Sequence, residues 1–125
     1  MSELDLSSFE KALESLANVL QQPLNQYIRD ASIQRFEYTF EISWKTLQRF
    51  LKLQGVETGS PKQVFRAAFK AKLIDAVEPW FGFLDARNLT THTYNENTAD
   101  EVYRAAGKFL PYVQELYKQL KKNED

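Results

Sequence analysis

The sequence predicts an all-α protein, an up-down antiparallel four-helix bundle with an additional short helix. Apolar residues recur at intervals of three and four, the period of one helical face. Helix-capping residues and prolines separate these runs from one another. No segment of four or more residues alternates cleanly between apolar and polar, so no sheet is expected. Amphipathic helices joined by short loops bury their apolar faces best in a bundle.

The first two helices follow from two such runs. The apolar positions of the first are Leu6, Phe9, Leu13, Leu16 and Leu20. Ser7 and Glu10 predict a capping box at its start, and Pro23 closes it. The second helix is expected to begin at Asp30 or Ser32 and to stop at Gly55. Its apolar stripe consists of Ile33, Phe36, Phe40, Trp44, Leu47 and Leu51.

The third helix is short and has a clear start signal. Ser60, Pro61 and Gln63 supply an N-cap, a proline at the first helical position and a capping glutamine, and the helix should run to about Lys72.

Two further helices complete the bundle. Asp75 with Glu78 opens the fourth, which carries Val77, Trp80, Phe81 and Leu84. Thr98 with Glu101 opens the fifth, which should bend but continue at Pro111. The tail 118–125 is expected to fray.

Composition narrows the classes of protein. A length of 125 residues favours one domain spanning 1–125. The chain has 16 Lys and Arg against 17 Asp and Glu, and this balance argues against a generally basic surface that binds duplex nucleic acid. The absence of cysteine excludes disulfides and thiolate sites. No apolar stretch approaches about 18 residues, and the N-terminus lacks the pattern of a secretory signal, so a cytoplasmic protein without membrane contact is expected.

Several kinds of chemistry lack their residues. The four glycines follow no phosphate-binding spacing. Gly59 and Ser60 are not followed by the paired carboxylates of a nucleotidyltransferase, so the chain is not expected to be one itself. With one histidine and no carboxylate cluster at helical ligand spacing, we expect no metal site and no cofactor.

Polar groups concentrate where the fourth helix ends, at Arg87, Asn88, His92 and Tyr94. Arg87 and Asn88 continue the apolar stripe through Trp80, where a charge needs a partner or a function. Arg87 and His92 are about 140° apart on a regular helix, so either the arginine reaches back or the helix loosens before His92.

A purely structural interpretation of these residues is also open. Arg87 would pair with Asp85 or with a distant carboxylate, and Asn88 would cap the helix. His92 would be an exposed loop residue, and Tyr94 a packing residue with a solvated hydroxyl.

The spacing Arg-x4-His-x-Tyr, present as Arg87, His92 and Tyr94, resembles the signature of HEPN-domain proteins. Together with residues 36–47 and the remainder of 87–94, it is similar to the nucleotidyltransferase substrate-binding protein family, a branch of that superfamily. The similarity extends over nearly the whole chain.

The resemblance implies a helical bundle, often dimeric, encoded with a minimal nucleotidyltransferase. In related pairs the bundle is a ribonuclease toxin, and the nucleotidyltransferase is the antitoxin that transfers AMP to the tyrosine of the motif. Carried over, Arg87 and His92 would be catalytic, Asn88 would support them, and Tyr94 would accept AMP. Members of this branch are also described simply as substrate-binding subunits.

These residue types are compatible with metal-free RNA cleavage, which needs a base, an acid and a cation on the developing phosphorane. One chain has a single histidine. A two-fold homodimer that joins both motifs would supply two histidines and two arginines.

A basic stretch precedes the motif. Between residues 45 and 72 seven basic residues oppose one glutamate, and Lys45, Arg49, Lys62 and Arg66 are its candidate RNA contacts. The alternative is a solvated helix surface, because charges on helices are ordinarily just exposed. Between residues 73 and 101, six acidic residues oppose a single basic residue, Arg87. This negative charge disfavours RNA near the motif unless the basic stretch or a second protomer compensates.

Three functions remain open. The first is a metal-independent ribonuclease neutralised by AMP transfer to Tyr94. The second is a non-catalytic subunit that holds a nucleotide or substrate for the partner enzyme. The third is a helical interaction module with a degenerate site.

Overall fold

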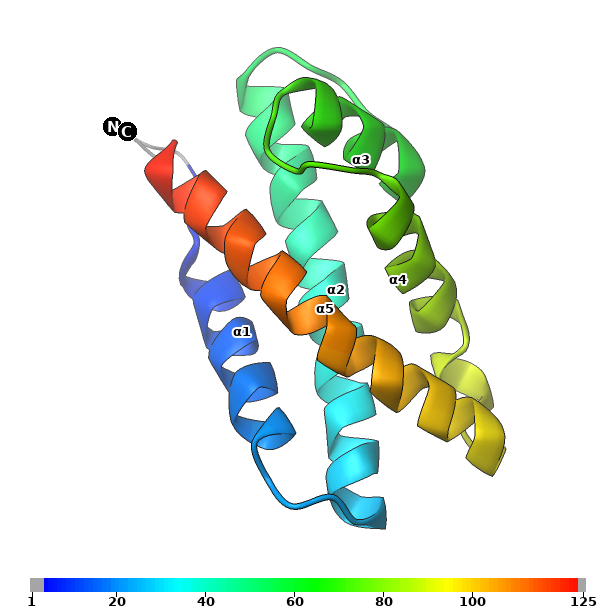
Figure 1. Ribbon diagram of the computed structural model, residues 1–125. Coiled ribbons are helices and arrows are strands. Elements are labelled where there is room, and N and C mark those ends of the chain that lie inside the picture. Colours follow the sequence, from blue (N-terminus) through cyan, green and yellow to red (C-terminus); the bar gives the residue numbers. More distant parts are fainter. Residues whose placement is uncertain (1–3, 124–125) are drawn as a thin grey trace.

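A computed structural model describes residues 4–123, which fold into five α-helices and one 3₁₀ turn (Figure 1). The elements are α1 (Ser7–Leu20), α2 (Gln26–Leu53), α3 (Pro61–Lys70), α4 (Glu78–Asn88), η1 (Thr90–His92) and α5 (Glu96–Lys122). No strand occurs in this range, and the chain direction alternates along α1, α2, α4 and α5. The predicted all-helical bundle is confirmed, with α3 as the additional short helix.

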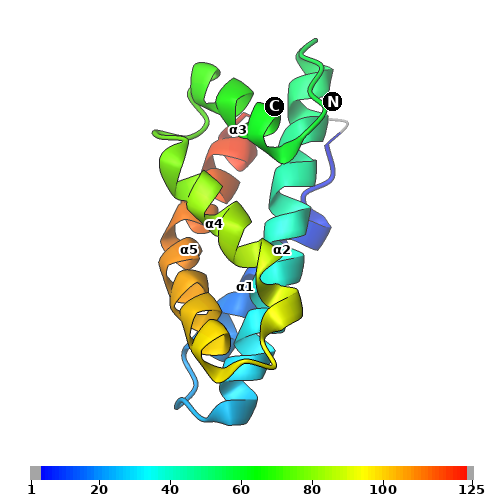
Figure 2. The same ribbon diagram turned by 90° about the vertical axis from the view of Figure 1, so that its right-hand side faces the viewer.

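The central element is α2, which contacts every other helix as well as η1. Its 28 residues span about 42 Å at the usual helical rise. On one side Thr39 donates a hydrogen bond to the carbonyl of Ala12, and the Tyr38 hydroxyl lies 2.7 Å from the hydroxyl of Ser15. Figure 2 shows α4 and η1 lying along the other side of α2.

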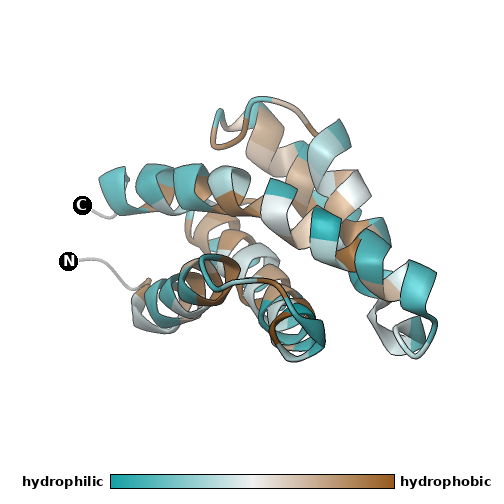
Figure 3. Ribbon diagram, turned by 60° about the horizontal axis from the view of Figure 1, so that its bottom comes forward, coloured by the Kyte–Doolittle hydropathy of each residue, from teal (hydrophilic) through white to brown (hydrophobic). Residues whose placement is uncertain are grey.

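The core is built around a cluster of aromatic rings. Phe109 of α5 lies 5.2 Å from Phe36 and 5.2 Å from Phe83, measured between ring centroids, and most of these pairs meet edge to face. The cluster consists of Phe36, Phe40, Phe65, Trp80, Phe83 and Phe109. Figure 3 shows apolar residues on the helix faces that meet one another and hydrophilic residues along the outer face of α5.

Two helix ends are C-capped in the same way by different residues. After α2, Gly55 has a φ of 86°, and the next amide, that of Val56, bonds the carbonyl of Leu51. After α3, Lys72 takes the equivalent position with a φ of 64°, and the amide of Leu73 bonds the carbonyl of Ala68. Gly55 was correctly predicted as a stop, whereas α3 ends at Lys70, two residues before the predicted end.

Several predicted helix starts are wrong. The Asn25 side chain caps α2 at the amide of Ile28, so α2 begins earlier than either predicted start. Asn95 caps α5, which begins at Glu96 and not at Thr98. Asparagine competes as an N-cap with serine, threonine and aspartate, and the sequence offered several of these in a row.

The remaining caps also differ from expectation. At α1 the predicted capping box does not form, because the helix already begins at Ser7 and the N-cap position falls on Leu6, which has no side-chain acceptor. The Ser7 amide donates to Asp5 instead. At α4 no side chain caps the first residue, Glu78. The start of α3 at Ser60 and Pro61 is confirmed.

The second half of α5 is more ordered than predicted. The helix continues through Pro111, as expected, and extends to Lys122. Leu120 is fully buried, which explains why residues 118–122 remain helical and do not fray. Residues 124 and 125 of the expected tail lie outside the described residues.

No helix in the described part of the chain is both long enough and apolar enough to span a membrane.

Candidate functional site

The segment 87–94 is placed between α2 and α5. Arg87 and Asn88 form the last turn of α4, and His92 ends the 3₁₀ turn η1, which contacts both α2 and α5. The helix therefore loosens before His92, which was one of the two predicted solutions to the angular mismatch between Arg87 and His92. The prediction that Asn88 continues the buried stripe is wrong, because Asn88 is not buried.

Arg87 is held by a carboxylate from another helix. Its guanidinium forms an ion pair with Glu41 of α2, and the side chains of Arg87 and Glu41 are 33% and 22% exposed. A second guanidinium nitrogen of Arg87 donates to the side-chain oxygen of Asn88 at 3.0 Å. The distant carboxylate of the structural interpretation is thus Glu41, and Asp85 does not supply it.

A second contact fixes the turn that follows α4. The Thr90 hydroxyl donates to Glu37 of α2 at 2.9 Å and lies 2.8 Å from the carbonyl of Arg87. Glu37 and Glu41 are one helical turn apart, so one stripe of α2 anchors both Thr90 and Arg87. These two glutamates were not singled out from the sequence, although they lie in the segment 36–47 that carries the family resemblance.

His92 and Tyr94 lie in neighbouring positions near the surface. Their rings meet edge to face with centroids 6.0 Å apart, and Tyr94 is 83% exposed. Tyr94 is therefore not a packing residue, and its hydroxyl is accessible as a nucleophile. The structure brings His92 to Tyr94 and Arg87 to Asn88 within one short segment.

The predicted basic contacts occupy different places. Lys62 and Arg66 of α3 both lie over the ring of Phe81, at 5.4 and 5.3 Å from its centroid. Lys45 of α2 lies 3.7 Å from a carboxylate oxygen of Glu41, next to the Arg87 pair.

Arg49 acts on a different part of the molecule from the α3 pair. It is close enough to Asp5 that it contributes to the lowered pKa of that carboxyl, whose main cause is the hydrogen bond from the Ser7 amide. Of the four predicted basic contacts, Lys62 and Arg66 thus share one aromatic ring, whereas Lys45 and Arg49 lie near different carboxylates.

A buried arginine fixes the start of α5. Arg29 of α2 donates to Glu96 at 2.6 Å and to Asp100 at 3.2 Å, and it also bonds Asp30. The hydrogen bond from Arg29 lowers the pKa of Glu96 below the ordinary value of 4.5. This cluster holds the helix that begins two residues after Tyr94.

Among residues 4–123, no group of three or more His, Cys, Asp or Glu side chains is arranged to hold a metal ion.

Comparison with known proteins places this arrangement in a family. The family described as nucleotidyltransferase substrate binding protein like matches residues 4–122. A Haemophilus influenzae protein named "Probable ribonuclease HepT" is 33% identical over 95 residues, which cover 72% of this chain and 65% of that protein. The match thus spans somewhat less than two thirds of the curated relative.

Two solved structures share the fold. A crystal structure of a Thermus thermophilus protein has 38% sequence identity and a TM-score of 0.84, with 90% of this chain and 98% of that chain covered. A second structure, from Haemophilus influenzae, is described as the fold of a substrate binding domain of a nucleotidyltransferase. It has 28% identity and a TM-score of 0.85, and the alignment covers 94% of this chain and 99% of that one. The chain therefore belongs to the family of nucleotidyltransferase substrate-binding proteins.

Proposed function

We propose that this protein is the partner subunit of a minimal nucleotidyltransferase and acts as a metal-independent ribonuclease that AMP transfer to Tyr94 silences. The observation that carries the proposal is the segment 87–94, where a half-buried arginine, a histidine and an exposed tyrosine lie within eight residues. The ribonuclease name of the Haemophilus influenzae relative supports the same reaction.

In this proposal His92 transfers protons as a general base, and Arg87 stabilises the negative charge that develops on the phosphate. His92 removes the proton of the RNA 2′-hydroxyl, whose oxygen attacks the adjacent phosphorus and expels the 5′-oxygen of the next nucleotide. The expelled oxygen takes up a proton, which a second histidine is placed to give if two protomers join their motifs. Arg87 stabilises the phosphorane, and Asn88 orients Arg87 through the 3.0 Å hydrogen bond.

Silencing would use the exposed hydroxyl of Tyr94. In the transfer step the Tyr94 oxygen attacks the α-phosphorus of ATP on the partner enzyme, pyrophosphate leaves, and the phenolic proton passes to solvent. The product carries a phosphodiester anion next to His92, whose ring lies 6.0 Å from that of Tyr94. A bulky anion there excludes the RNA phosphate by charge and by volume.

The test of silencing uses a matched tyrosine. Tyr27, at the start of α2, is 82% exposed against 83% for Tyr94, so exposure alone predicts equal modification of the two residues. Incubation with the neighbouring nucleotidyltransferase, ATP and magnesium should add AMP to the wild-type chain and to Tyr27→Phe but not to Tyr94→Phe, as read by intact mass spectrometry. An unmodified wild-type chain under conditions where the partner consumes ATP would refute AMP transfer.

The test of cleavage is independent of the partner. Purified protein in EDTA should cut single-stranded RNA to products with 2′,3′-cyclic phosphate ends, and His92→Ala should abolish cutting with the helical circular dichroism unchanged. Light scattering at high protein concentration should report a dimer. Equal inertness of the wild-type and His92→Ala proteins on varied RNAs would refute the nuclease.

A second candidate function is a non-catalytic subunit that holds a nucleotide for the nucleotidyltransferase. The pairing of Arg87 with Glu41 favours it, because a guanidinium whose charge is paired with a carboxylate stabilises a developing phosphorane less well but can still donate a hydrogen bond to a nucleotide phosphate. A stable complex with the partner that shows nucleotide binding, without modification or RNA cutting, is the outcome that this function requires.

A further inference from the structure

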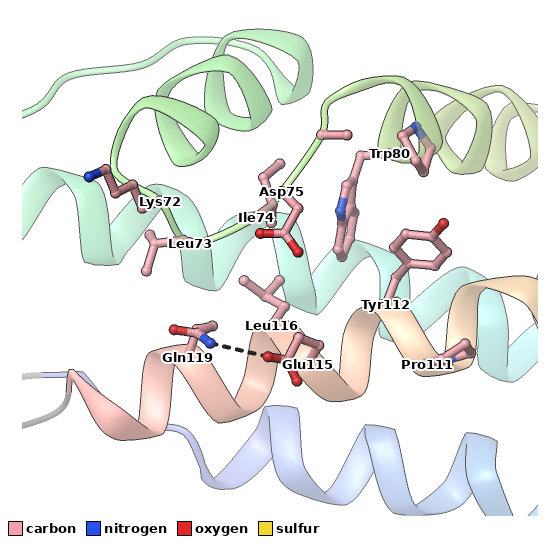
Figure 4. Close-up of a pocket in the computed structure, with 12 residues that line it drawn as sticks. Lys72, Leu73, Ile74, Asp75, Trp80, Pro111, Tyr112, Glu115, Leu116 and Gln119 are labelled. Atoms are coloured by element: carbon pink, nitrogen blue, oxygen red, sulfur yellow. Dashed lines mark hydrogen bonds between the residues drawn. The ribbon is translucent and has the colours of Figure 1, made fainter.

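A cavity of about 410 Å³ lies at the N-terminal end of α4 (Figure 4). The candidate site lies at the other end of that helix, where Arg87 and Asn88 form its last turn. It is bounded by the α3–α4 loop, by the first turn of α4 and by the second half of α5. Trp80 lines it, and Arg87 follows seven residues later, about 10 Å further along the helix axis. The cavity is therefore separate from the segment that carries the proposed function.

The apolar wall of the cavity is held rigidly. Trp80 is 1% exposed, and its ring contacts Phe65, Phe83 and Phe109 at centroid distances of 5.3, 5.9 and 5.7 Å. The ring of Tyr112, which is 44% exposed, packs on Phe83 at 5.3 Å. Trp80 is therefore part of the buried core behind the cavity, and the Tyr112 ring that packs on this core is the accessible apolar surface. A surface fixed in this way exists before any ligand arrives, which reduces the entropy cost of binding.

The loop side of the cavity is also fixed. Lys72 closes the C-terminus of α3 with its φ of 64°, and the Leu73 amide donates to the carbonyl of Ala68 at 2.9 Å. Leu73 and Ile74, the next residues of the loop, are buried and line the cavity. Figure 4 shows the Lys72 ammonium directed away from the other lining side chains.

The polar groups that enter the cavity are mainly hydrogen-bond acceptors. Asp75 brings a carboxylate from the loop and Glu115 brings another from α5, on facing sides of the cavity (Figure 4). Gln119 donates to one oxygen of Glu115 at 3.1 Å, which orients that carboxylate and leaves its second oxygen for another donor. The Tyr112 ring adds the electron-rich face that attracts a cation.

We propose that this cavity binds a small organic cation, namely a primary ammonium group carried on an aromatic or alkyl body. The ammonium group lies between the exposed carboxylates of Asp75 and Glu115, and the body packs against the exposed ring of Tyr112 and against the half-buried Pro79. Two carboxylates satisfy the charge and the N–H donors of an ammonium, whereas they repel a carboxylate or phosphate ligand. An inorganic cation is not the preferred occupant, because two carboxylates do not complete the oxygen shell of such an ion and no group of three or more His, Cys, Asp or Glu side chains is arranged to hold one among the described residues.

The test uses three probes of similar size but different charge, namely phenethylamine, 2-phenylethanol and 3-phenylpropanoate. The protein carries Trp44→Phe, so that Trp80 is the single remaining tryptophan and reports the cavity by fluorescence. This substitution is mild because the indole N–H of Trp44 is buried without a hydrogen-bond acceptor among the described residues. Amide chemical shifts of Leu73, Ile74 and Leu116 give a second readout.

Phenethylamine should bind in roughly the millimolar range and about tenfold more tightly than the alcohol, with the propanoate weaker still. Asp75→Asn combined with Glu115→Gln should remove that tenfold preference and leave affinity for the alcohol unchanged. The control is Glu101→Gln, an exposed glutamate on the same helix and 14 residues away, which should behave as wild type.

Equal binding of the three probes would overturn the proposal, and so would an unchanged preference in the double variant. Shift changes centred on His92 and Tyr94 in place of the cavity residues would overturn it as well.

Discussion

Replacing Glu41 by glutamine should strengthen the binding of RNA at Arg87. In the folded protein Glu41 neutralises the Arg87 guanidinium, and Gln keeps the size of the side chain and an oxygen acceptor. A phosphate on the outer side of the guanidinium would lie about 6 Å from the Glu41 carboxylate. With the high effective dielectric of a partly exposed site, that repulsion costs about 1 kcal/mol. Its removal should tighten binding about fivefold.

The assay is fluorescence anisotropy with a labelled ten-nucleotide oligouridylate whose 2′-oxygens are methylated, so that it cannot be cleaved. The gain should be largest at low ionic strength and should fade as salt screens the charge. Glu14→Gln is the matched control, since Glu14 is exposed on α1, which packs on α2 and α5 away from α4.

A double-mutant cycle separates local from overall charge. In a protein that already carries Arg87→Ala, Glu41→Gln should tighten oligouridylate binding by no more than Glu14→Gln does. If Glu41→Gln weakens binding, or changes it only as much as the control, then Arg87 does not bind the phosphate in the way proposed.

Three further predictions concern stability. Replacing Lys72 by glycine should raise the free energy of unfolding by about 0.5–1 kcal/mol, because Lys72 has a φ of 64°, which glycine adopts without strain. The gain should appear as a higher melting temperature, whereas Lys70→Gly, at the last residue of α3, should lower the melting temperature. Phe109→Ala should cost about 4 kcal/mol, or roughly 15 °C in melting temperature, because the ring is fully buried among aromatic neighbours, and a loss below about 1 kcal/mol would contradict that packing. Arg29 lowers the pKa of Glu96, so the stability that this pair contributes is present above pH 4.5 and is lost as the pH falls through the lower pKa of the folded state. The difference in melting temperature between wild type and Glu96→Gln should therefore shrink from pH 6 to about pH 3. A difference independent of pH would contradict the last prediction.

Helix type and approximate position were predictable because they depend on local features. The apolar period and the capping residues together located all five helices, and Ser60 with Pro61 marked the start of α3 correctly. Exact starts were less predictable, since Asn25 and Asn95 compete with nearby polar residues and the choice depends on where each helix packs.

The candidate site was only partly visible in the sequence. Arg87, His92 and Tyr94 stand close together in the chain, so their spacing could be recognised directly. The exposure of Tyr94 and the pairing of Arg87 with Glu41 could not, because they depend on how α2 lies against α4 and η1.

The sequence by itself determined the helical class, the approximate order of elements and the residue types available for chemistry, because periodicity, caps and motif spacing act over a few residues. The tertiary structure alone decided which distant groups meet. Glu41 lies 46 residues before its partner Arg87, and Glu37 lies 53 residues before its partner Thr90. Such pairs form only when helices pack, and their position is set by the shared aromatic core and not by any local signal.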